Sequence, residues 1–134
     1  MQAVDTNVLV RFLMNDDQHQ AAAVERFFEE CEANCEEVYI SLPVLCEMVW
    51  VLERSFRQTK GEIICGLERL LLIEFFQFDR DILVRKAFEQ YRRGRASLAD
   101  YLIGELSVQA GCRHTVTFDR GLRGAPGFTI LGSK

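Results

Sequence analysis

The chain opens with MQAVDTNVLV (residues 1–10), a short apolar segment that stops at Asp5 and is followed by a second apolar stretch. We expect residues 1–4 to form a strand. A helix is expected over Val8–Met14, capped by Thr6 or Asn7, because short polar side chains accept hydrogen bonds from the first N–H groups of a helix. Asp5 then lies at the carboxyl end of a strand, which is where α/β proteins bind ligands.

The rest of the chain alternates between helical and strand patterns. Helix starts are marked by cap signals, and Gly94 is a stop signal; these starts are Asp17, Ser41, Thr59, Asp79 and Ser97. The helices they open are expected to end near residues 33, 56, 73, 93 and 111, with strands at 38–40, 74–78, 114–118 and 128–131. This alternation predicts an α/β fold, a three-layer sandwich with a mostly parallel central sheet flanked by helices, in a single domain over residues 1–134.

The composition is that of a globular protein, with 49% hydrophobic and 27% charged residues and a net charge of −4. No apolar run reaches the roughly 20 residues of a membrane helix, and the start lacks a secretory pattern, so we expect a soluble, cytoplasmic protein. Five cysteines without a C-x-x-C motif argue against a disulfide framework and against zinc. Nucleic-acid binders are usually basic, but here the acidic residues concentrate before residue 50.

Acidic residues stand at positions that suit a common site. Asp5 and Asp119 each follow a predicted strand, so both belong to the carboxyl edge of the sheet. Asp100 is in the first turn of its helix, where it can instead simply complement the helix dipole. Glu47 falls at the border of the apolar arc of its helix, so it either points into a cleft or reaches water as a boundary residue.

Four carboxylates in one cleft would repel one another and would need a cation. An all-oxygen site suits Mg²⁺ or Mn²⁺ and does not suit zinc. Such ions assist phosphoryl chemistry by stabilising charge and activating water. Paired carboxylates can also serve a glycosidase, but so small a fold leaves little room for a sugar-binding groove.

Four segments in sequence order resemble the blocks of the PIN domain family, and together they span nearly the whole chain. They are DTNVL (5–9), SLPVLCE (41–47), SLADYLI (97–103) and VTFD (116–119). The length, without an additional domain, is similar to that of the VapC-type toxins of bacterial toxin–antitoxin pairs.

The resemblance implies a Mg²⁺- or Mn²⁺-dependent endoribonuclease that hydrolyses RNA with a metal-activated water, in line with the leaving 3′ oxygen. Asp5 and Asp100 match the direct metal ligands, and Asp119 and Glu47 complete the acidic quartet. Thr6, Asn7 and Thr117 would orient carboxylates or contact phosphate, unless they only cap helices or end strands. The residues that flank the acids and can hold RNA are Arg92, Arg93, Arg95, Arg120 and Arg123.

The resemblance also implies an RNA substrate, a small VapB-like antitoxin and a homodimer. One alternative is a PIN-like RNA-processing nuclease without an antitoxin. Another is a partner-binding module with a vestigial acidic site, using a groove made by Leu70–Ile73, Phe75, Phe76, Phe78 and the helix of Trp50. Phosphatases that form an aspartyl-phosphate carry a second aspartate where this chain has Asn7, which disfavours that class.

Overall fold

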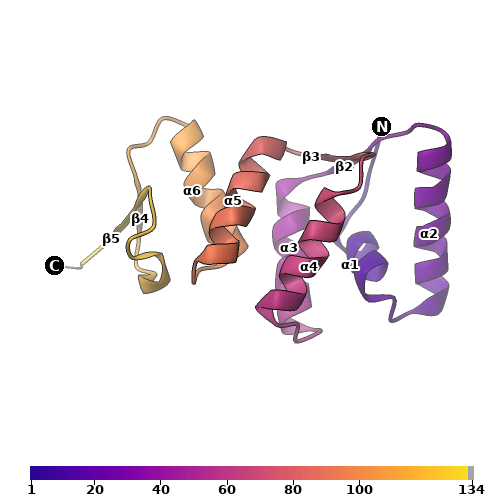
Figure 1. Ribbon diagram of the computed structural model, residues 1–134, viewed down its shortest axis with the longest axis horizontal. Coiled ribbons are helices and arrows are strands. Elements are labelled where there is room, and N and C mark those ends of the chain that lie inside the picture. The colour runs from indigo at the N-terminus through magenta and orange to yellow at the C-terminus, as the bar shows by residue number, and fades with distance from the viewer. Residues whose placement is uncertain (133–134) are drawn as a thin grey trace. The chain divides into compact units, whose positions relative to one another are not determined.

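The computed structural model describes residues 1–132, which divide into two compact units, residues 1–79 and residues 80–132. Each unit combines parallel strands with helices (Figure 1). None of the helices within residues 1–132 has the length and apolar composition needed to span a bilayer.

The first unit is built on a parallel sheet of order β1-β2-β3. Its elements are β1 (Gln2–Ala3), α1 (Thr6–Met14), α2 (Gln18–Ala33), β2 (Val38–Ile40), α3 (Leu42–Arg54), α4 (Lys60–Leu71) and β3 (Phe76–Phe78). Val38 and Ile40 are buried while Tyr39 between them is partly exposed, as the alternation of side chains along a strand requires. Helix α1 packs against both α2 and α3, and its Phe12 meets Phe28 edge to face, with ring centroids 5.1 Å apart.

The second unit contains α5 (Asp81–Arg93), α6 (Leu98–Gln109), β4 (Thr115–Thr117), the 3₁₀ helix η1 (Arg120–Leu122) and β5 (Phe128–Ile130). Strands β4 and β5 are parallel, and α5 packs along α6. Gly104 of α6 leaves room for the ring of Phe128, since a β-carbon there would lie 2.6 Å from Phe128 Cζ. The absence of a side chain at residue 104 thus lets β5 approach α6 closely.

The predicted α/β class with mostly parallel strands is confirmed, because every strand pair among the described residues is parallel. The strands fall into two sheets, one in each unit. Two cap assignments are wrong. Asp5, not Thr6 or Asn7, is the N-cap of α1. Helix α5 begins after Arg80, which adopts φ 52°, and not after Asp79, whose N–H donates to Ile40 O at 2.9 Å and so continues the strand ladder.

Candidate functional site

Asp5 and Glu47 follow two neighbouring parallel strands of the first unit's sheet. Asp5 follows β1 and caps α1, its Oδ1 accepting a hydrogen bond from the N–H of Val8 at 3.3 Å. Glu47 is in the second turn of α3, the helix that follows the neighbouring parallel strand β2, and its side chain is exposed. Since α1 and α3 start from adjacent parallel strand ends and pack together, the starts of both helices lie at the same edge of the sheet.

The two polar residues after Asp5 differ in environment. Thr6 is only 7% exposed, whereas Asn7 is exposed. Because the cap is formed by Asp5, neither residue has the capping role that the sequence suggests. Their orienting or phosphate-binding roles stay predictions, and Asn7 is the one of the two that solvent can reach.

Asp100 in the second unit is fixed by a reciprocal capping box with Ser97. The Asp100 N–H donates to Ser97 Oγ at 3.2 Å, while Asp100 Oδ2 accepts from the Ser97 N–H at 3.1 Å and from its hydroxyl at 2.8 Å. The same oxygen takes both bonds, so Oδ1 remains unused by the cap. The predicted cap at Ser97 is confirmed, and the aspartate is part of it.

Asp119 is anchored in a similar way at the end of β4. Its N–H donates to Thr117 Oγ1 at 3.0 Å, and its Oδ1 accepts from the Gly121 N–H at 2.8 Å. A β-carbon at Gly121 would lie 3.0 Å from that Oδ1 and 3.6 Å from the carbonyl oxygen of Arg95. The turn holding Asp119 therefore adjoins the turn that leads to Asp100. Thr117 accepts a bond from the Asp119 backbone, and its predicted contact with phosphate stays a prediction. A glycine-rich turn is the only signal in the sequence for Gly121.

The donors present suit a hard divalent cation. Three of the acids use one carboxylate oxygen for a local bond, and within residues 1–132 Glu47 has no hydrogen-bond or ion-pair partner. The remaining oxygens are ligands of the type that Mg²⁺ and Mn²⁺ prefer. Neither unit on its own brings three or more His, Cys, Asp or Glu side chains together over the described residues. Two of the four candidate carboxylates lie in each unit.

The five candidate arginines fall into two groups. Arg92 and Arg93, in the last turn of α5, reach Glu89 at 3.4 and 3.9 Å, and Arg92 also lies over the ring of Phe88. Such pairing is ordinary for helix surfaces. Arg95, Arg120 and Arg123 are exposed in the turns that hold Asp100 and Asp119. These last three are better placed to meet a phosphate beside the acids.

Two of the cysteine thiols have raised pKa values. Burial raises the pKa of the Cys46 thiol, next to Glu47, and burial with the nearby Glu36 and Glu30 raises the pKa of Cys31. A raised pKa leaves little thiolate, and the thiolate is the reactive form. All five cysteines are free thiols among the described residues.

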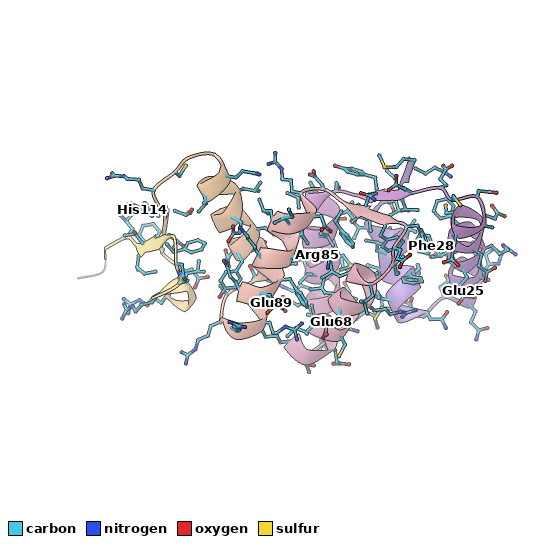
Figure 2. The ribbon with its side chains drawn as sticks, turned by 45° about the horizontal axis from the view of Figure 1, so that its top comes forward. Glu25, Phe28, Glu68, Arg85, Glu89 and His114 are labelled. Carbon is cyan, nitrogen blue, oxygen red and sulfur yellow. The ribbon has the colours of Figure 1, made fainter. Side chains whose placement is uncertain are left out.

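A groove of about 940 Å³ lies elsewhere in the first unit, between α2 and the segment after α4. Its apolar surface comes from Phe12, Phe28, Leu72, Ile73 and Phe75, and acidic side chains surround it at Glu25, Glu29, Glu32 and Glu74. Glu25 and Phe28 are both on α2 (Figure 2). Of the residues that the sequence predicts at a groove, Leu72, Ile73 and Phe75 line this one. Leu70, Phe76 and Phe78 are instead buried core residues, and Trp50 does not line the groove.

Comparison with known proteins shows which family the chain belongs to. The sequence profile of the PIN domain matches residues 3–127. The chain belongs to the PIN domain family. It is also similar to the VapC ribonuclease of Aquifex aeolicus (strain VF5), with 27% identity over 120 residues, which covers 90% of this chain and 88% of that protein.

Proposed function

We propose that this PIN domain protein is an endoribonuclease that uses Mg²⁺ or Mn²⁺ and is the toxin of a VapBC-type pair. In the proposal Asp5, Glu47, Asp100 and Asp119 are the residues that hold the ion. The observation that carries it is the anchoring of the three aspartates by one oxygen each, which leaves the other oxygen for an ion. The family match across both units and the similarity to a VapC ribonuclease give further support.

Asp5 Oδ2 and Asp100 Oδ1 are the proposed direct ligands, with Asp119 and Glu47 completing the set directly or through water. When bound, the ion supplies Lewis-acid stabilisation of the phosphoryl charge and makes water a better nucleophile at neutral pH. Local caps hold the aspartates in one rotamer, so little side-chain freedom is lost when substrate binds. Glu47, which no local bond holds, is suited to accept a proton from the attacking water.

The reaction is hydrolysis of an RNA phosphodiester. Water attacks phosphorus in line with the 3′ oxygen, the P–O3′ bond breaks, and the products carry a 5′ phosphate and a 3′ hydroxyl. Arg95, Arg120 and Arg123 are the proposed phosphate contacts, because a guanidinium binds phosphate through paired N–H groups. Single-stranded or loop RNA is the expected substrate, since its backbone can enter a narrow site.

The decisive experiment compares Asp5→Asn with Asp17→Asn on structured RNAs, with Mg²⁺, with Mn²⁺ and with EDTA. Both aspartates are N-caps with the same local bond, since Asp17 Oδ1 accepts from the Gln20 N–H at 3.0 Å, and asparagine caps equally well. We expect Asp17→Asn to cleave like the wild type and Asp5→Asn to be inactive, with EDTA abolishing all cleavage. Equal cleavage by the two variants would refute the proposal.

The partner in this proposal is a small VapB-like antitoxin, and we place a segment of it in the groove beside α2. Apolar surface in the groove suits Leu, Ile or Phe side chains, and the surrounding glutamates suit Lys or Arg. The expected segment is therefore amphipathic and basic. Its binding should weaken as salt rises, because exposed charges are screened.

Co-expression with the small protein encoded beside this gene tests the partner. Glu29→Lys reverses a charge at the groove and should abolish co-purification while RNA cleavage persists. Glu53→Lys makes the same change on the exposed face of α3 and should have no effect. No co-purification with the wild type would favour a PIN-like RNA-processing nuclease without an antitoxin. Homodimerisation, tested by light scattering, and a cytoplasmic location belong to the same proposal.

A further inference from the structure

The turn between α5 and α6 closes around the hydroxyl of a buried tyrosine. Tyr101, on the first turns of α6, is 3% exposed, and its Oη accepts a hydrogen bond from the N–H of Ala96 at 3.3 Å. Ala96 is also buried, and a buried backbone N–H that loses its partner costs free energy. The tyrosine hydroxyl is thus the internal partner of the turn.

Gly94 lets the turn pass over the ring. A β-carbon there would lie 1.8 Å from Tyr101 Oη, 2.7 Å from its Cζ and 3.0 Å from the carbonyl oxygen of Gln90. The backbone of Gly94 is ordinary extended chain, φ −98° and ψ −171°, so any residue could adopt its conformation. Glycine is needed here for space, because the turn and the phenol are in direct contact.

The same turn carries groups of the proposed nuclease site. Ser97, one residue after Ala96, forms the capping box with Asp100. On the other side of Ala96, the carbonyl of Arg95 lies against Gly121, whose N–H holds Asp119. A shift of the turn would therefore move Ser97, which bonds to Asp100, and Arg95, which contacts the glycine that bonds to Asp119.

We propose that Tyr101 is a positioning residue of the nuclease site, whose hydroxyl fixes the 94–97 turn and thereby aims Asp100 and the Arg95 side chain. The inference rests on the proposed function. Residues that orient metal-ligating carboxylates typically change metal affinity or activity by about 10- to 100-fold when they are altered. Tyr101 itself touches no substrate in this role.

Tyr101→Phe tests the inference because it removes one oxygen and keeps the packed ring. The control is Tyr91→Phe, at the other buried tyrosine of the unit, which is also 3% exposed. Mn²⁺ affinity is measured by electron paramagnetic resonance, and kcat and KM are measured on RNA. We expect Tyr101→Phe to weaken Mn²⁺ binding by about tenfold and to lower kcat by a similar factor with KM little changed. Tyr91→Phe should stay within about twofold of the wild type for each quantity.

Two further measurements keep the test decisive if stability falls. Hydrogen exchange of the Ala96 amide should accelerate in Tyr101→Phe and not in Tyr91→Phe. Gly94→Ala places a β-carbon against the phenol of Tyr101 and should produce the same losses of Mn²⁺ affinity and kcat. If Tyr101→Phe lowers only the melting temperature and leaves Mn²⁺ affinity and kcat unchanged, Tyr101 is merely structural and the inference is overturned. If the wild type neither binds Mn²⁺ nor cleaves RNA, the proposed function fails and the inference fails with it.

Discussion

Exchanging the two members of the Ser97–Asp100 capping box separates the stability of α6 from the proposed chemistry. Ser97→Ala removes the acceptor for the Asp100 N–H and the hydroxyl donor to Asp100 Oδ2. Loss of a helix N-cap costs about 1 kcal/mol in free energy of unfolding. For a chain of this size, that lowers the melting temperature by about 3–4 °C. Asp100 keeps its charge and the bond from the Ser97 N–H, so cleavage should fall by less than about tenfold.

Asp100→Asn should show the opposite pattern. The amide oxygen can still accept from Ser97, so only the favourable interaction of a negative charge with the helix N-terminus is lost, about 0.5 kcal/mol. Removing a proposed metal ligand should lower kcat by at least about 100-fold, equivalent to several kcal/mol of transition-state stabilisation.

Calorimetry and RNA cleavage on the same preparations check both variants. The proposed roles require Ser97→Ala to be less stable but active. They also require Asp100→Asn to be stable but inactive. If Asp100→Asn cleaves RNA at the wild-type rate, the carboxylate is only a cap. If Ser97→Ala is as inactive as Asp100→Asn while both remain folded, capping and chemistry have not been separated and the reasoning is wrong.

Thr59→Ala removes the capping box of α4 and should cost about 1 kcal/mol in calorimetry, while RNA cleavage below the melting transition stays unchanged. Gly104→Ala places a methyl group 2.6 Å from Phe128 Cζ and should destabilise the protein by about 1–3 kcal/mol, whereas a Phe128→Leu change added to it should recover part of that loss; simple additivity in denaturant melts would contradict the contact. Iodoacetamide at pH 8 should label the exposed Cys35 and spare Cys31, which is buried and whose raised pKa reduces its thiolate fraction; equal labelling by peptide mass spectrometry would refute this.

Cap signals predict the start of a helix correctly where capping is the only local role of the polar side chain. Thr59 and Ser97 both open capping boxes at the positions the sequence predicts. The predicted cap at Asp79 is wrong because the backbone of Asp79 still pairs with the neighbouring strand, so α5 starts one residue later. Ser41 is the N-cap residue of α3 but its side chain makes no cap bond. Local sequence propensity cannot show that a predicted cap residue pairs with a strand that is distant in the chain.

The candidate acids were identifiable because strand ends and helix starts are local patterns. The anchors of the three aspartates are also local, spanning two or three residues in each case. Whether Asp5 and Glu47 meet Asp100 and Asp119 depends on packing between distant segments, so it stays a prediction. Tyr101 carries no signal of its role in the sequence, since nothing there marks a phenol that bonds to a turn five residues earlier.

Capping and metal binding are compatible roles for the same carboxylate. A carboxylate has two oxygens with about four acceptor sites, and a cap uses one oxygen. The cap holds the side chain in one rotamer, and the free oxygen is then presented from a fixed point at the end of a helix or strand. An aspartate is short enough that one bond fixes it, which explains why the three anchored acids are all aspartates. Glu47 is longer, has no local anchor and extends from a helix surface. We therefore expect Glu47→Asp to lower the rate of RNA cleavage, because reach is the property that Glu47 contributes. Asp5→Glu is expected to lower the free energy of unfolding, because Asp5 is the N-cap of α1.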